Sequence, residues 1–143
     1  MIDAKELRIG NYLSGNNDPE MQVFSINPIN GVEMGFIGMQ EDESIDYGLW
    51  YYNLSELKPI PLTEEWLLKF GCRKLTAEKH ICYCIEINEQ ISIYISIDKL
   101  VLVEVGIGED DNEYLSIIDY VQMVHQLQNL YFSLSGKELE FKN

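Results

Sequence analysis

The sequence predicts an α+β protein, and three patterns in the 143-residue chain carry this prediction. Residues 7–62 contain short apolar segments separated by turn signals, which is typical of small antiparallel β structures. Residues 80–105 alternate apolar and polar side chains, as half-buried strands do. Residues 119–136 instead repeat apolar side chains every three or four positions, which indicates an amphipathic helix.

The N-terminal segments predict a small SH3-like β-barrel over residues 1–61. The expected strands cover residues 7–13, 21–26, 32–39 and 49–52. The turn signals between them are SGNNDP, NPING and the acidic loop QEDESID. The glycines in or beside the third strand permit the bends that a tightly curved sheet requires; they are Gly31, Gly35 and Gly38. We expect the remaining residues, 62–143, to form an α+β domain.

Four aromatic residues close to the acidic loop form a candidate binding platform. They are Tyr47, Trp50, Tyr51 and Tyr52. On a small barrel such a group can bind a peptide or a small ligand. The alternative is that these rings fill the core and pair across strands, which is the commoner use of aromatic residues near strand ends.

A short helix is expected at residues 63–70, after a single helical turn in NLSEL and an extended segment in KPIPL. Thr63 is the expected N-cap, and Gly71 is expected to stop the helix. Acidic residues in its first turn suit the positive end of the helix dipole. The expected buried face consists of Trp66, Leu67 and Phe70.

Three strands of a β-meander are expected next, in the segments HICYCIEI, QISIYISI and KLVLVEVG. Residues that lie directly opposite each other point to the same face of a sheet. Matching the isoleucine faces therefore predicts that Ile85 pairs with Ile91 across a loop of residues 87–89. The same rule places the valines of the third segment on this face, with a loop of residues 98–100.

A long C-terminal helix is predicted from Asp119, a suitable N-cap, to Gly136, a suitable C′ residue. Its apolar stripe must be buried, and it consists of Tyr120, Val124, Leu127, Tyr131 and Leu134. After this helix the segment KELEFK alternates Leu139 and Phe141, which predicts a final edge strand.

The polar face of the long helix carries no charged residue between positions 121 and 134. A solvated helix face normally carries Lys, Glu or Arg, so this face is expected to meet another surface. That surface is the chain's own N-terminal half, a protein partner or second copy, or a binding cleft. The candidate interface residues are Gln122, His125, Gln126 and Asn129. No nucleophile or carboxylate lies one turn from His125, so no catalytic residue is assigned.

Residues with metal-ligand chemistry occur around the first strand of the meander. They are Cys72, His80, Cys82 and Cys84. Alternate side chains of a strand lie about 7 Å apart, farther than two thiolates of one tetrahedral zinc site. The acidic run GEDDNE lacks the ligand order of a calcium loop, and VGIGED lacks the third glycine of a dinucleotide-binding loop. We therefore expect no metal, no cofactor and three reduced thiols.

The net charge of −14, from 24 acidic residues against 10 Lys and Arg, opposes direct binding to nucleic acid or to an anionic membrane. No apolar segment is long enough to cross a bilayer, and the N-terminus lacks a signal-peptide pattern, so a cytoplasmic location is expected. An acidic surface serves solubility, draws basic partners, or imitates the charge of DNA and so occupies a DNA-binding protein.

Three segments of the chain carry a family resemblance: ELRIGN at residues 6–11, PIPLTEEWLLKFG at residues 59–71 and VHQLQNLYF at residues 124–132. They resemble the shared blocks of an uncharacterised protein family from Bacteroidetes genomes, their prophages and related mobile elements. The resemblance implies a bacterial cytoplasmic setting with a phage connection. It brings no substrate, cofactor or catalytic residue to this chain.

These observations lead to three functional hypotheses. The first is a non-enzymatic protein-interaction module of a phage or mobile element, which binds a protein partner or a second copy of itself. The second is a small enzyme with a cleft between barrel and helices, where His125 meets an acid or a thiol. The third is an acidic inhibitor that mimics DNA. The sequence favours the first hypothesis because no catalytic constellation is visible in it.

Overall fold

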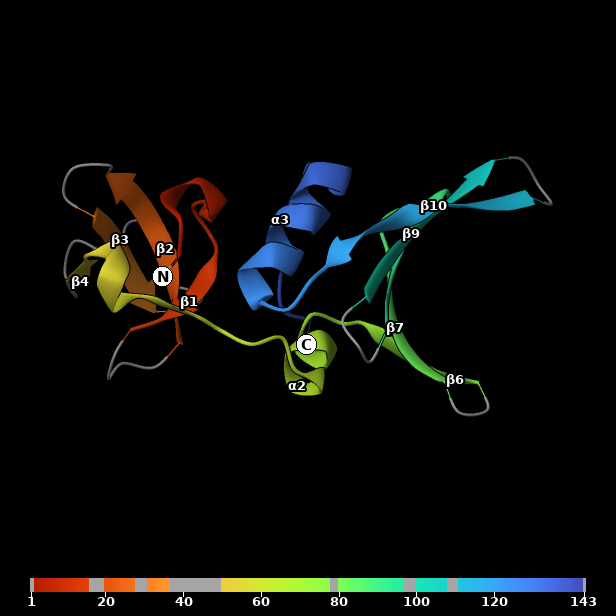
Figure 1. The fold of residues 1–143 in the computed structure, drawn as a ribbon, viewed down its shortest axis with the longest axis horizontal. Helices are drawn as coiled ribbons and strands as arrows, with labels where there is room; N and C mark the ends of the chain where they lie inside the picture. Colours follow the sequence, from red (N-terminus) through yellow and green to blue (C-terminus); the bar gives the residue numbers. More distant parts are fainter. Residues whose placement is uncertain are drawn as a thin grey trace. The chain divides into compact units, whose positions relative to one another are not determined.

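The computed structural model describes residues 2–15, 20–27, 31–36, 50–77, 80–96, 100–107 and 111–142. Within these ranges the chain is mixed α+β, with two five-stranded antiparallel sheets and few helices (Figure 1). It divides into two compact units. Unit 1 comprises Met1–Pro61 and Met123–Asn129, and unit 2 comprises Leu62–Gln122 and Leu130–Asn143. No helix in the described part of the chain is long and apolar enough to cross a membrane.

Unit 1 is built on a sheet with the strand order β4-β3-β2-β1-β5. The strands are β1 (Tyr12–Ser14), β2 (Glu20–Asn27), β3 (Gly31–Phe36), β4 (Trp50–Tyr52) and β5 (Lys58–Pro59). A 3-10 turn, η1 (Ala4–Glu6), precedes β1, and a second one, η3 (Leu54–Glu56), connects β4 to β5. The core of this unit includes Leu13, Met21, Val23, Val32 and Met34. Among the described residues no pairing joins β4 to β5, so the described strands do not close into a barrel.

The first predicted strand of unit 1 is largely replaced by turn structure. Of residues 7–13, only the last two lie in β1, and the residues before them follow η1. Asp3 caps η1, because its Oδ1 accepts a hydrogen bond from the backbone N–H of Lys5 at 3.0 Å. The next two predicted strands correspond to β2 and β3, while residues 37–39 and the acidic loop lie outside the described residues.

Unit 2 holds the second sheet, with the strand order β10-β9-β8-β7-β6. Its strands are β6 (Arg73–Ala77), β7 (His80–Glu86), β8 (Ile91–Ser96), β9 (Leu100–Ile107) and β10 (Asp111–Tyr120). The predicted meander forms β7, β8 and β9, so the three expected strands are the middle of a larger sheet. Both predicted registers are wrong by two residues, since Ile85 pairs with Ile93 and Ile95 pairs with Val101. A shift of two residues keeps each side chain on its face, so the isoleucines and valines still share one face.

The turn after β7 explains the shifted register. Asn88 Oδ1 accepts hydrogen bonds from the backbone N–H groups of Gln90 and Ile91, both at 2.8 Å. The N–H of Ile87 donates to the carbonyl of Ile91 at 2.9 Å, which keeps Ile87 paired. An asparagine side chain that bonds to the backbone two and three residues on closes a tight turn. The loop therefore comprises residues 88–90 rather than the expected 87–89.

Helix α2 (Glu64–Lys69) begins and ends at the predicted signals. Thr63 Oγ1 accepts a hydrogen bond from the N–H of Trp66 at 3.4 Å, which confirms the N-cap. Gly71 follows the helix with a φ of +82°, a left-handed conformation that favours glycine. A side chain at position 71 would also collide with Lys142. The predicted buried face is confirmed for Trp66, Leu67 and Phe70.

Helix α3 (Val124–Ser135) begins after Met123, so its predicted start at Asp119 is wrong. Asp119 and Tyr120, the expected N-cap and first helical residue, belong to β10, which pairs with β9 in the long hairpin of Figure 1. Pairing with a neighbouring strand overrides the local helical period there. The helix starts where Gln126 Oε1 accepts a hydrogen bond from Met123 N–H at 3.1 Å. Gly136 ends it with a φ of +71°, as predicted.

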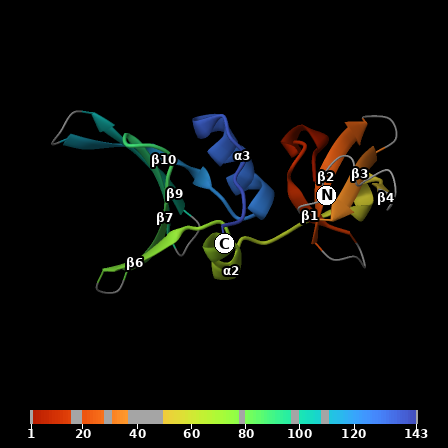
Figure 2. The same cartoon turned by 180° about the vertical axis from the view of Figure 1, so that it is seen from behind.

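The C-terminal segment, residues 137–142, forms no strand, so the predicted final edge strand is wrong. Phe141 instead packs against Trp66 and Phe70, with ring centroids 5.6 and 5.5 Å apart. The N–H of Lys142 donates to the carbonyl of Lys69 at 2.8 Å. The segment lies beside α2 when the molecule is seen from the front (Figure 1) and from behind (Figure 2). Its apolar residues therefore cover α2 instead of extending a sheet.

Candidate functional site

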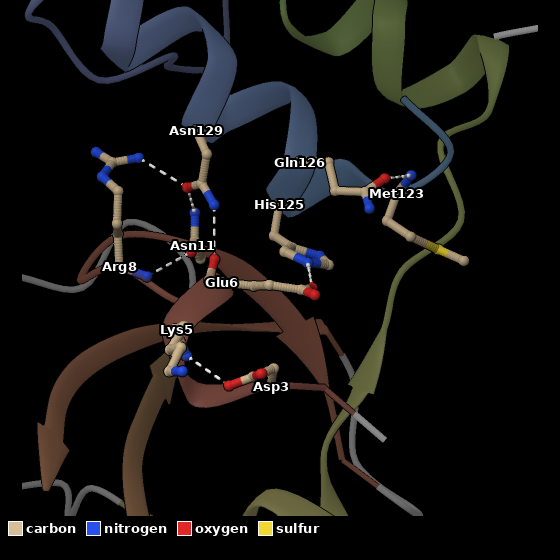
Figure 3. A network of polar contacts seen from close by, with 9 residues as sticks. All are labelled: Asp3, Lys5, Glu6, Arg8, Asn11, Met123, His125, Gln126 and Asn129. Carbon is tan, nitrogen blue, oxygen red and sulfur yellow. Dashed lines mark hydrogen bonds and ion pairs between the residues drawn. The ribbon is translucent and has the colours of Figure 1, made fainter. Parts of the chain in front are cut away.

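The predicted interface on α3 contacts residues 6–12 of unit 1, called the N-terminal segment below (Figure 3). Asn129 Oδ1 accepts hydrogen bonds from Arg8 Nη1 and Asn11 Nδ2, both at 2.9 Å. The Nδ2 of Asn129 donates to the carbonyl of Glu6 at 2.6 Å. Asn11 Oδ1 in turn accepts from the backbone N–H of Arg8 at 2.6 Å. One asparagine of the helix therefore holds three residues of the N-terminal segment.

Gln128 makes the most buried of the polar contacts between α3 and this segment. It is not among the four interface residues predicted from the sequence. Its Oε1 accepts a hydrogen bond from Tyr12 N–H at 2.8 Å, and its Nε2 donates to the carbonyl of Gly10 at 3.0 Å. The side chain is 1% exposed. A signal was present in the sequence, because Gln128 lies one turn after Val124 of the apolar stripe.

His125 is an internal residue of unit 1, with 1% of its surface exposed. Its Nε2 lies 3.4 Å from Glu6 Oε2, and its Nδ1 has no hydrogen-bond partner within the described part of the chain. Burial lowers the pKa of His125, and the neighbouring carboxylate of Glu6 offsets part of that lowering. The imidazole is therefore neutral at pH 7.

We expect the free energy of unfolding to fall as the pH drops below about 6.5, because the unfolded chain protonates His125 more readily than the folded chain does. A base whose pKa is lowered by folding contributes stability above its unfolded pKa and loses it as the pH falls toward the folded pKa. One such group changes the free energy by at most about 1.4 kcal/mol per pH unit. Urea denaturation from about pH 8 to about pH 5.5 should give a flatter profile for His125→Gln than for the wild type.

The matched control for this measurement is His80→Gln, because the chain has two histidines. The effect assigned to His125 is the part of the fall in stability that His125→Gln removes and His80→Gln retains. If the wild type and His125→Gln lose stability equally, the pH dependence comes from other groups and the effect assigned to His125 is wrong.

The pair of His125 and Glu6 is the histidine and acid that the enzyme hypothesis requires. A general base must reach its substrate within hydrogen-bond distance. His125 is buried, and it lines neither of the two hollows of unit 1 described below. The contact of this pair joins α3 to the N-terminal segment.

The other two predicted interface residues lie at the start of α3. The side chain of Gln126 caps the start of the helix. Gln122 is exposed, and its backbone carbonyl accepts a hydrogen bond from Leu62 N–H at 2.9 Å. Of the four residues, His125 and Asn129 thus contact the N-terminal segment. These contacts correspond to the alternative in which the uncharged face packs against the chain's own N-terminal half.

Two of the thiols near β7 are enclosed by the protein. Cys72 and Cys84 are buried and free of disulfide bonds. Burial raises the pKa of both thiols, to about 12 for Cys72, where the neighbouring Cys84 adds to the rise. Metals bind the thiolate form of cysteine. Among the described residues no group of three or more His, Cys, Asp or Glu is placed to hold a metal ion.

Three of the four residues of the predicted aromatic platform lie on one strand, β4. Successive side chains of a strand point to opposite faces of the sheet. In β4, Trp50 and Tyr52 pair with buried residues of β3, whereas Tyr51 pairs with Glu33. Tyr51 therefore points away from the face that Trp50 and Tyr52 share. Tyr47 lies outside the described residues.

A hollow of about 330 Å³ opens where Tyr51 projects from the sheet. The described residues that line it are Ser25, Asn27, Glu33 and Tyr51. Ser25 pairs with Glu33, and Glu33 pairs with Tyr51, so these three residues form a row across β2, β3 and β4. Ser25 Oγ lies 2.7 Å from Glu33 Oε1 and donates a hydrogen bond to it. Tyr51 is 65% exposed. The hollow thus combines a carboxylate, a hydroxyl, an amide and an exposed aromatic ring.

The row of three residues depends on a β-bulge in β2. Val23 pairs with Met34, but Ser25 pairs with Glu33, so Phe24 is the extra residue of the bulge. The bulge changes the phase of side-chain alternation, and Ser25 comes to lie on the face of Glu33. Without this extra residue Ser25 would point toward the core.

A second hollow, of about 200 Å³, lies beside η3. It is lined by Ala4, Ile26, Asn27, Gly31, Val32, Asn53 and Leu54. None of these described lining residues is charged. This hollow offers few groups that would orient a ligand. The first hollow, called the Tyr51 hollow below, offers the four polar or aromatic side chains that line it.

No protein-family model, no curated protein and no solved structure matches the chain.

Proposed function

We propose that the protein is a non-enzymatic protein-interaction module of a phage or mobile element, and that it binds a partner's peptide segment at the Tyr51 hollow. The observation that carries this proposal is the exposure of Tyr51, 65%, beside a recess rimmed by polar side chains. Tyrosine is enriched among the residues that contribute most to binding at protein interfaces. A recess of about 330 Å³ is at the lower end of ligand pockets and suits one side chain of a partner.

We also propose that unit 1 is an SH3-like domain. The strand order β4-β3-β2-β1-β5 and the 3-10 turn between β4 and β5 support this assignment. SH3 domains bind extended peptides in grooves lined by aromatic residues. The resemblance of residues 6–11, 59–71 and 124–132 to a family of prophages and mobile elements supports the phage context.

An enzymatic function has weaker support than binding, since His125 is enclosed by the N-terminal segment. The DNA-mimic hypothesis rests on the net charge alone. The peptide-binding proposal is preferred because it uses a recess, an exposed ring and hydrogen-bonding groups that lie together on one face.

The proposal is tested by selecting peptides from a displayed random library on the immobilised full chain. We expect enriched peptides to bind the wild type and to bind Tyr51→Ala about tenfold more weakly, because truncating an anchoring aromatic residue costs more than about 1 kcal/mol. Fluorescence anisotropy of the labelled peptides gives the dissociation constants.

Ile9→Ala is the matched control, because Ile9 is a large apolar residue of unit 1 that is 63% exposed and does not line the hollow. It should leave the affinities unchanged. The proposal fails if no peptide is enriched, or if the enriched peptides bind Tyr51→Ala as tightly as they bind the wild type.

A further inference from the structure

We infer that the Tyr51 hollow recognises a cationic side chain, a lysine or an arginine, in the peptide segment of a protein partner. This inference rests on the proposed function and adds the chemistry of the partner to it. Four features carry the inference: the carboxylate of Glu33, the ring of Tyr51, the row in which they lie and the charge of the surrounding chain.

Glu33 supplies a negative charge that is already oriented. Its Oε1 accepts a hydrogen bond from Ser25 Oγ at 2.7 Å, and this bond limits the rotation of the carboxylate. An ionised carboxylate accepts hydrogen bonds at about four lone-pair sites, so the bond from Ser25 leaves capacity for the N–H groups of a ligand. Bonds between a cationic donor and a carboxylate are about twice as strong as neutral ones.

Tyr51 supplies the second contact that a cation requires. Directly opposed side chains of neighbouring strands have Cβ atoms about 5 Å apart, so the ring of Tyr51 and the carboxylate of Glu33 stand side by side. A cation within about 6 Å of a ring centroid is attracted to the aromatic face. The apolar stem of lysine or arginine packs on such a ring while its charged head reaches the carboxylate.

The charge of the chain favours the same ligand. Residues 1–61 contain only three basic residues, Lys5, Arg8 and Lys58, and none of them is among the described residues that line the hollow. The guanidinium of Arg8 donates a hydrogen bond to Asn129 Oδ1 at 2.9 Å. A net charge of −14 raises the local concentration of cationic partners and speeds their approach. An anionic ligand would meet the carboxylate of Glu33, and none of the described lining residues offers it a compensating cation.

A titration with two matched peptides tests this inference. The probes are acetyl-GGRGG-amide and the same peptide with citrulline, a neutral isostere, in place of arginine. We expect the arginine peptide to shift the amide NMR signals of residues 25, 27, 33 and 51 with roughly millimolar affinity, and the citrulline peptide to leave them unchanged. Glu33→Gln should bind the arginine peptide about fivefold more weakly, because the amide keeps an acceptor for Ser25 but lacks the charge.

Glu20→Gln is the control for non-specific attraction. Glu20 is an exposed acid of the same strand as Ser25 and is not among the lining residues, and its variant carries the same change in charge. The inference is overturned if arginine and citrulline peptides cause equal shifts, or if Glu20→Gln weakens binding as much as Glu33→Gln. It is also overturned, with the proposed function intact, if library peptides need Tyr51 but keep their affinity when their lysines and arginines are replaced by norleucine and citrulline. Failure of the library selection itself would overturn the proposed function.

Discussion

Replacing Gln128 with leucine is expected to lower the free energy of unfolding of unit 1 by about 2–3 kcal/mol. Leucine fills a similar volume but offers no acceptor to the N–H of Tyr12, which lies 2.8 Å from Gln128 Oε1. The carbonyl of Gly10 keeps its hydrogen bond from Gln22 Nε2 at 3.2 Å, so the loss is concentrated at Tyr12. A buried backbone donor without a partner costs about 1–3 kcal/mol, and the bond to Gly10 is lost in addition.

Trp50 reports this change, because the chain has two tryptophans and Trp50 lies in unit 1. Urea denaturation followed by its fluorescence in a Trp66→Phe background measures the free energy of unfolding. Glu20→Leu is the control, since Glu20 is exposed in β2 of the same unit. That variant should change the stability by less than about 0.5 kcal/mol. A loss below the same limit for Gln128→Leu would show that Gln128 does not hold Tyr12.

Local signals in the sequence were sufficient to predict several boundaries and faces. Thr63 and Gly71 predicted the ends of α2, and Gly136 predicted the end of α3, because caps and left-handed residues act within one turn. The isoleucine and valine faces of the meander were also correct, because alternation along a strand is a local property.

Non-local pairing decided the parts that the sequence pattern predicted wrongly. Residues Asp111–Tyr120 form a strand because β9 pairs with them, and Asp119 has a suitable N-cap side chain whether or not a helix follows. The β7–β8 register depends on the turn that the side chain of Asn88 closes. Matching the apolar faces of two strands does not reveal this turn, because registers two residues apart match the faces equally well. Tertiary contacts override local preferences in this way because propensities are worth less than about 1 kcal/mol per residue.

The candidate site was predictable in part. Strand alternation alone predicts that Trp50 and Tyr52 share one face of the sheet and that Tyr51 lies on the other. The placement of Ser25 beside Glu33 was not predictable, because it requires the bulge at Phe24. The absence of charge on α3 did indicate a face that meets another surface. It could not separate packing within the chain from binding to a partner, because both use uncharged polar side chains.

Replacing Phe141 with alanine is expected to destabilise unit 2 by about 2–4 kcal/mol. The ring of Phe141 contacts the rings of Trp66 and Phe70, whose centroids lie 5.7 Å apart. The substitution therefore leaves a gap beside two buried aromatic residues. The fluorescence of Trp66 in a Trp50→Phe background reports the unfolding of this unit during urea denaturation. The emission of the folded state should also shift, because Trp66 loses an aromatic neighbour.

Two further variants separate ring packing from other causes of instability. Phe132→Ala is the matched control, because Phe132 is 39% exposed, and it should cost less than about 1 kcal/mol. Phe141→Leu keeps most of the apolar volume and should lose only the contribution of ring pairing, about 1 kcal/mol. If the C-terminal segment were held mainly by backbone hydrogen bonds, as in an edge strand, Phe141→Ala would cost no more than Phe132→Ala. That result would contradict the packing of this segment on α2, whereas a loss several times larger than the control requires it.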